Sequence, residues 1–195
     1  MNSKNPSRRA YGFKDKMTLG EKIFFGSACT LAAFLTAIIQ TSFFFNFRPF
    51  GFAPDLCLAL SAAVGVKFGP KCAGIVGLLS GFFVDCFSSS GVSLSIPFYI
   101  AVGLLMGFMT WEGSVINLPH FLTFLIGTGG GALAYGFLST VVICLKFSSF
   151  NIGDVLFKTV LPEILITVAF SLAVYPTVAL VYRIIRKKQG FLPKK

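Results

Sequence analysis

Charged residues are scarce in this sequence. They make up 12% of its 195 residues, whereas a soluble domain of this size carries roughly a quarter. Hydrophobic residues make up 55%, Phe alone occurs 24 times, and the mean hydropathy is +0.81. Because the apolar residues come in long runs, the shortage of charge indicates that lipid is the solvent. The sequence therefore predicts an integral membrane protein and excludes an ordinary soluble domain.

The sequence also lacks the residues that carry most enzyme chemistry. It has one histidine, His120, and no CxxC pair among five scattered cysteines. The nucleophile-elbow, zinc-protease, phosphate-loop and dinucleotide-binding motifs are absent. Gly129-Gly130-Gly131 lacks the Lys-Ser/Thr that a phosphate loop needs. We therefore predict that the protein is not an enzyme and that it holds no cofactor and no metal ion.

Negative charge is rare, and the positive charge lies near the two ends of the chain. The formal net charge is +10, and twelve of the seventeen basic residues lie between Lys4 and Lys22 or between Arg183 and Lys195. Basic segments that flank apolar runs set membrane topology and contact anionic headgroups. We therefore expect both ends on the cytoplasmic side, an even number of crossings, and no binding of nucleic acid.

The apolar runs predict an all-α bundle of about six transmembrane helices, with a basic tail over residues 1–21 and another over 183–195. The expected spans of the transmembrane domain, residues 22–182, are 22–45, 54–67, 70–87, 94–111, 121–145 and 162–182. The second and third spans are short for a bilayer core of roughly 30 Å. They could instead form a re-entrant pair, which would leave four full crossings, and the sequence leaves both alternatives open.

Glycines recur at a spacing of four residues within the expected spans. Gly77 and Gly81 form one such pair, and Gly103 and Gly107 form another. Pairs of this kind let helix backbones approach closely in lipid. These glycines are therefore candidates either for packing within the bundle or for docking a partner helix.

Few ionisable residues lie within or beside the spans, and such residues are default functional candidates. In the six-span topology Gln40, Arg48, Asp55 and Asp85 all lie toward the outer surface, so we expect them to meet in one polar cluster. The alternative for Asp55 is a helix N-terminal residue stabilised by the helix dipole, and Asp85 could simply end its helix. Glu163, which follows Pro162, is expected to be another first-turn carboxylate.

Residues 40–107 resemble the family of the rod-shape-determining membrane protein MreD. The resemblance is carried by a set of polar, Gly and Pro positions: Gln40, Pro54-Asp55-Leu56, Gly69-Pro70, Gly74, Gly77, Gly81, Asp85, Gly91, Tyr99, Gly103 and Gly107. The covered part is about a third of the chain; the rest agrees only in length, hydropathy and a basic C-terminus. The N-terminal tail is longer than is usual for the family.

The resemblance implies a non-enzymatic scaffold of the bacterial cell-elongation complex in the cytoplasmic (inner) membrane, active in peptidoglycan synthesis. Its expected partners are an MreC-like single-span protein, the elongation glycosyltransferase and transpeptidase, and MreB-like filaments. The implied fold is similar to that of the substrate-binding subunits of energy-coupling-factor transporters. The alternative function is therefore such a subunit for a vitamin or a metal, and a third is a membrane subunit of another complex.

Overall fold

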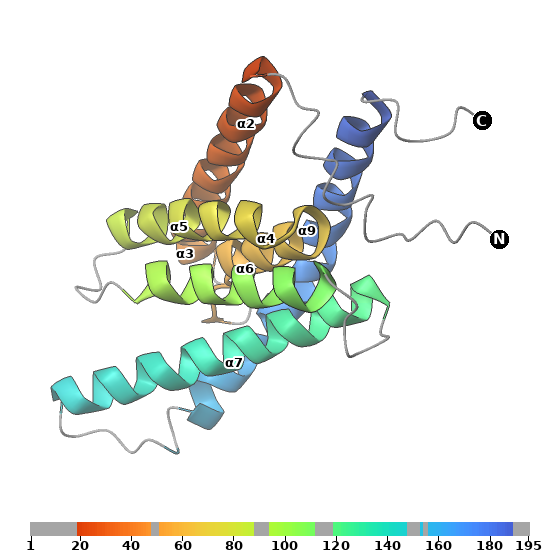
Figure 1. Ribbon diagram of the computed structural model, residues 1–195. Helices are drawn as coiled ribbons and strands as arrows, with labels where there is room; N and C mark the ends of the chain where they lie inside the picture. The colour runs from red at the N-terminus through yellow and green to blue at the C-terminus, as the bar shows by residue number, and fades with distance from the viewer. Residues whose placement is uncertain are drawn as a thin grey trace.

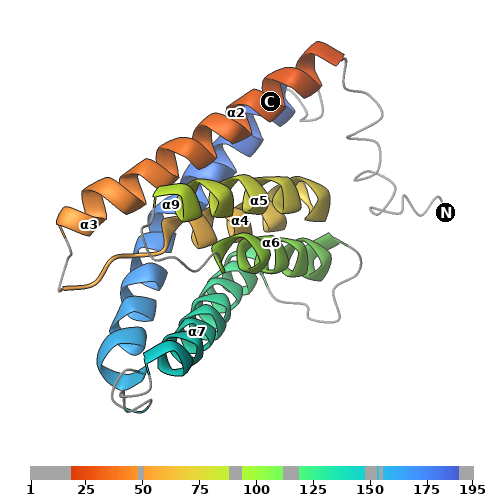
Figure 2. The ribbon, with the colours of Figure 1, turned by 90° about the vertical axis from the view of Figure 1, so that its left-hand side faces the viewer.

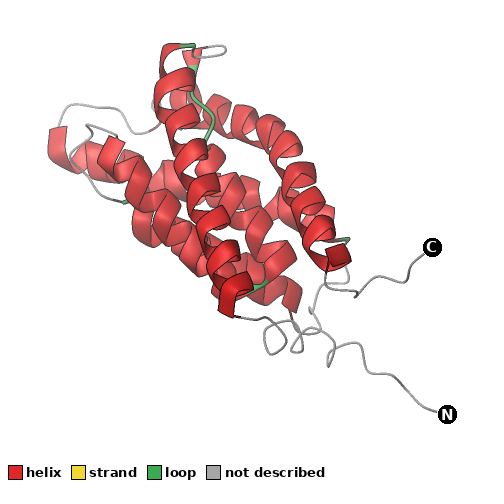
Figure 3. Ribbon diagram, turned by 90° about the horizontal axis from the view of Figure 1, so that it is seen from above, coloured by secondary structure: helices red, strands yellow, loops and turns green. Residues whose placement is uncertain are grey.

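The computed structural model describes residues 19–47, 51–87, 94–111, 119–147, 153 and 156–188. The described residues are almost entirely helical and include no strand (Figure 3). The all-α fold class predicted from the sequence is thereby confirmed. Arg48, which was expected in the polar cluster, lies outside the described residues, as do the basic tail before Leu19 and the residues after Lys188.

The described residues form six successive helical segments (Figure 1). Their bounds are α2 (Leu19–Ile38), which continues through a π-helical turn η1 (Ile39–Phe43) into α3 (Phe44–Asn46), then α4 (Leu56–Phe68), α5 (Pro70–Phe87), α6 (Ser95–Trp111), α7 (His120–Phe147), and α9 (Leu161–Lys188) with a π-helical turn η3 (Leu156–Val160) before it. The beginning of α2 and the end of α9 both lie at the top of Figures 1 and 2.

Only four of these segments are long and apolar enough to cross a membrane. They contain the runs Gly26–Phe43, Pro70–Phe87, His120–Val142 and Phe157–Ile184, whereas α4 and α6 are shorter apolar helices. The 13 residues of α4 extend about 20 Å at 1.5 Å per residue. This is less than a hydrocarbon core of roughly 30 Å, so the six segments are not equivalent spans.

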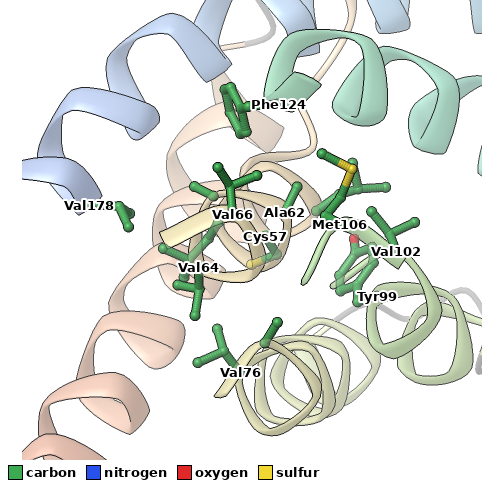
Figure 4. Packing of buried hydrophobic residues seen from close by; sticks show 14 of the residues in the cluster. Cys57, Ala62, Val64, Val66, Val76, Tyr99, Val102, Met106, Phe124 and Val178 are labelled. Carbon is green, nitrogen blue, oxygen red and sulfur yellow. The ribbon is translucent and has the colours of Figure 1, made fainter. Parts of the chain in front are cut away.

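The short helix α4 forms the centre of the bundle. Every residue from Leu56 to Val66 is buried, and α4 packs against α2, α5, α6, α7 and α9. Figure 4 shows side chains such as Val76 of α5, Met106 of α6 and Phe124 of α7 arranged around it. Figure 2 shows α2 on one side of the layer formed by α4, α5 and α6, and α7 on the other. A helix that is apolar on all faces is stable only when neighbours enclose it.

The turn from α4 into α5 depends on Gly69. Its φ of +87° is open to glycine but strained for residues with a Cβ atom, and its N–H donates to the carbonyl of Gly65 at 3.1 Å. Pro70 then begins α5, a position that suits proline because the first helical N–H has no partner within the helix. This tight connection brings α5 directly back along α4.

Large apolar side chains cover the outside of the bundle. Exposed examples lie on five helices: Leu31 and Leu35 of α2, Ile75 of α5, Leu105 and Phe108 of α6, Phe137 of α7 and Leu165 of α9. An apolar surface this extensive is far larger than a soluble monomer exposes. It is the surface expected where lipid tails surround the protein, in agreement with a membrane protein.

Candidate functional site

The carboxyl group of Asp55 joins three structural elements. Asp55 is the N-cap of α4, and its Oδ1 accepts a hydrogen bond from the N–H of Leu58 at 3.1 Å. The same oxygen accepts a second bond from the hydroxyl of Tyr99 on α6 at 2.7 Å. The backbone N–H of Asp55 donates to Oγ1 of Thr167 on α9 at 3.0 Å. Asp55 therefore fixes the start of α4 relative to both α6 and α9.

Gln40 adds the first helix to this junction. It lies within the π-helical turn η1, and its Oε1 accepts a hydrogen bond from the N–H of Cys57 at 2.9 Å. Asp55 and Gln40 thus satisfy two of the N–H groups that the first turn of any helix leaves without partners. The π turn falls where Gln40 makes this contact, and turns of this kind frequently occur at functional sites.

A small cavity opens beside Asp55 between α4, α7 and α9. Its volume is about 30 Å³, which is more than the roughly 10–15 Å³ that a cavity needs to hold one water molecule. Its lining combines two carboxyl groups, three hydroxyl groups and a few small or apolar residues: Asp55, Ala132, Tyr135, Gly136, Ser139, Val160, Glu163, Ile164 and Thr167. Carboxyl and hydroxyl groups from distant parts of the sequence therefore converge on one point inside the bundle.

One carboxyl oxygen of a residue that lines this cavity lacks a hydrogen-bond donor. Oδ2 of Asp55 is buried and has no partner. Tyr135 is within hydrogen-bonding distance of Ser95, with 3.1 Å between the two hydroxyl oxygens. Buried carboxylates without compensation are costly in an apolar surrounding. The region is therefore acidic and poorly neutralised by the described hydrogen bonds.

The cluster expected from the sequence is present only in part. The structure brings together Gln40 and Asp55 through the first turn of α4. Asp85 lies on α5 with both carboxyl oxygens buried and without a hydrogen-bond partner, so it does not bond to Asp55 or Gln40. The structure does not test the expected pairing with Arg48.

The four candidate glycines lie where α5 and α6 cross. A Cβ atom added to Gly77 would stand 2.5 Å from the carbonyl oxygen of Tyr99, and one added to Gly81 would stand 2.5 Å from the Cα of Ile96. A Cβ on Gly103 would stand 3.0 Å from the carbonyl oxygen of Ala73, and one on Gly107 would overlap Pro70. These glycine faces are therefore occupied by the chain's own helices and do not face a docking partner.

Sequence reasoning missed half of the polar junction. Tyr135 and Thr167 were not singled out, and Glu163 was expected only as a first-turn residue, which it is in α9. No local signal marks their convergence, because Thr167 lies 112 residues from Asp55. The only available signal was the presence of polar side chains in otherwise apolar spans, which in a membrane usually face the interior of a bundle.

The described residues contain no group of three or more His, Cys, Asp or Glu side chains that could hold a metal ion. None of the five cysteines forms a disulfide. No model of a protein family, no curated protein and no solved structure matches this chain. The geometry of the junction around Asp55 is therefore the basis for any functional assignment.

Proposed function

We propose that this chain is an MreD-like scaffold of the bacterial cell-elongation complex, which works by holding partner helices and not by chemical turnover. One observation carries the proposal: the described residues that resemble the family lie on helices that pack against one another. Gln40, Asp55 and Tyr99 meet at the start of α4, and the glycines from Gly77 to Gly107 close α5 onto α6. Residues spread over positions 40–107 thus contribute to the packing of one group of helices.

In this proposal the partner docks on the lipid-facing surface. The glycine faces are filled by the neighbouring helices, so a single-span, MreC-like protein has to meet side chains that point outward. The first long helix has the smallest buried share of the four long apolar runs, since only 11% of its window Gly26–Phe43 is buried. Helix association in lipid relies on close van der Waals packing, which such a face can provide.

The proposed location is the cytoplasmic membrane with both ends of the chain inside. Lys67 and the exposed Lys71 flank the α4–α5 turn, and Phe68 stacks edge-on against Tyr182 near the end of α9, with 5.1 Å between ring centroids. Basic residues of the turn and of the end of α9 therefore share one end of the bundle. The positive-inside rule places that end in the cytoplasm.

The cavity beside Asp55 is too small to be the pocket that the alternative function, a vitamin-binding transporter subunit, would need. Ligand pockets for small molecules usually measure about 300–1,000 Å³, whereas the cavity beside Asp55 measures about 30 Å³. The elongation scaffold therefore remains the better-supported function, with an MreC-like protein as the direct partner and the elongation glycosyltransferase, transpeptidase and MreB-like filaments as further members of the complex.

Photo-crosslinking in the native cells tests this proposal. A photoreactive amino acid is placed at one exposed position on each of four helices, Leu35, Leu105, Leu133 and Leu172, and at the buried Ala63 as the control. We expect at least one exposed position to capture an MreC-like single-span protein or an elongation enzyme, and Ala63 to capture none. Capture of ATP-binding-cassette ATPases and their coupling subunit would contradict the scaffold function.

A further inference from the structure

We infer that the cavity beside Asp55 binds one small, hard cation of the Na⁺ or Ca²⁺ kind, held between the carboxyl groups of Asp55 and Glu163. The inference concerns the interior of the bundle. It is independent of the proposed scaffold role, which concerns the outer surface.

The first argument is an unsatisfied oxygen of Asp55, a residue that lines the cavity. Asp55 is only 7% exposed. Its Oδ1 has two donors, Leu58 and Tyr99, whereas its Oδ2 is buried and has none. A buried carboxylate oxygen without a donor is unfavourable unless a positive charge or a proton compensates it. The cavity lies beside this carboxyl group and provides space for such a charge.

The second argument is the chemistry of the lining. Glu163 contributes a second carboxyl group, and Tyr135, Ser139 and Thr167 contribute hydroxyl oxygens. Ser139 donates its proton to the carbonyl of Gly136 at 3.0 Å, and this leaves its oxygen lone pairs available. Hard cations prefer such all-oxygen sets, whereas softer transition metals prefer nitrogen and sulfur. The lining contains no histidine and no cysteine.

The third argument is size. A volume of about 30 Å³ exceeds the roughly 10–15 Å³ that one water molecule needs. It therefore has room for a small ion coordinated by protein oxygens, and it is about a tenth of the smallest usual pocket for an organic ligand. A cation here would also hold the N-terminal ends of α4 and α9 to α7, because Asp55 is the N-cap of α4, Glu163 lies in the first turn of α9 and Ser139 lies on α7.

Thermal unfolding of the full chain in detergent tests the inference. The unfolding midpoint is followed during titration with NaCl, CaCl₂ or MgCl₂, with choline chloride added to keep the ionic strength constant. We expect Na⁺ or Ca²⁺ to raise the midpoint saturably, as a ligand specific for the folded state does, and choline to have no effect. Equilibrium dialysis with ²²Na⁺ or ⁴⁵Ca²⁺ should then give one ion per chain.

Three carboxyl variants localise the ion. Asp55→Asn keeps an N-cap residue that still accepts from Leu58 and Tyr99, and Glu163→Gln keeps the side-chain shape. Each variant should raise the cation concentration needed for half-saturation at least tenfold. Asp85→Asn is the matched control, because it removes a buried carboxyl group that does not line the cavity, and it should leave half-saturation unchanged. If the first two variants fail to fold, Ser139→Ala replaces them, with the same direction of effect.

Three outcomes would overturn the inference. The first is a midpoint that no cation shifts relative to choline but that rises on acidification, since a proton would then neutralise the pair. The second is an equal loss of response in Asp85→Asn, which would make the effect general to the acidic region. The third is dialysis with the wild-type chain that finds well under one ion per chain.

Discussion

Asp55 combines several structural roles in one residue. It caps α4, accepts from the hydroxyl of Tyr99 and lines the cavity, while its backbone N–H binds Thr167. Asp55 is therefore a helix N-cap residue, which is one of the two alternatives that the sequence left open, and of the expected polar cluster it shares the first turn of α4 with Gln40 alone among the described residues. The hydrogen bonds of Asp55 depend on the shape of its side chain, whereas its effect on the cavity depends on its charge, and substitutions can separate the two.

Replacing Asp55 by Ala should destabilise the bundle by about 1–3 kcal/mol, because it removes a helix cap and leaves the buried Tyr99 hydroxyl without an acceptor. Replacing it by Asn should cost clearly less, since the amide oxygen can accept both bonds. Reversible unfolding of each variant in mixed micelles measures the difference. Equal stability of the Ala and Asn variants would show that the capping bonds contribute nothing.

Asp85 offers a second test at the residue scale. Both of its oxygens are buried without a hydrogen-bond partner, and the sequence predicts Arg48 as its counter-charge. If the two pair, Arg48→Asp and Asp85→Arg should each reduce the yield of folded protein, and the double variant should restore it. Size-exclusion chromatography of the detergent-solubilised variants measures the folded fraction. A double variant no better than either single one would refute the pairing.

At the scale of helices, glycine spacing determines how closely α5 and α6 approach. A side chain at Gly81 would run into the backbone of Ile96, and backbone cannot move aside as the end of a side chain can. The sequence left open whether these glycines serve the fold or a partner. The structure assigns them to the crossing of two neighbouring helices, so a substitution there acts on the fold first.

Gly81→Leu should therefore destabilise the bundle by about 1–3 kcal/mol or more through overpacking, while the chain still inserts because the helix remains apolar. The matched control is Gly130→Leu on α7, where an added Cβ meets nothing within 4 Å. Thermal unfolding in detergent distinguishes the two. The crossing would be looser than described if Gly81→Leu and Gly130→Leu unfolded at the same temperature.

Helices were predictable from the sequence where hydropathy alone determines them, whereas their contacts were not. The apolar run before Phe45 predicts one continuous span, yet the structure contains a π-helical turn at Gln40, which no apolar pattern encodes. Likewise, Glu163 and Thr167 are separated from Asp55 by more than 100 residues. Their meeting depends on how α9 packs against α4, a tertiary property that local periodicity does not contain.

The whole molecule has an apolar surface and an uneven distribution of charge along its length. Asp55 lies at the start of α4 and Asp85 near the end of α5, whereas Lys67 and Lys71 lie at the connection between these helices. Lys67 stands over the ring of Tyr175 at 4.8 Å, so its charge is held against α9. Acidic groups therefore lie toward one end of the α4–α5 pair and basic groups at the other.

This asymmetry predicts the orientation of the protein in the membrane. If the positive-inside rule applies, the connection at Lys71 faces the cytoplasm and the end of α3 at Asn46 faces the outside, because they lie at opposite ends of α4. Asn46 and Lys71 are both exposed. Each is replaced by Cys in a chain whose native cysteines are changed to Ser.

A membrane-impermeant maleimide applied to intact spheroplasts should label the residue at position 46 and not the one at position 71, and both should be labelled after lysis. Labelling of position 71 alone in intact spheroplasts would invert the topology and place the acidic cavity nearer the cytoplasm. Labelling of both positions before lysis would mean that α4 does not separate the two faces, as in a re-entrant pair.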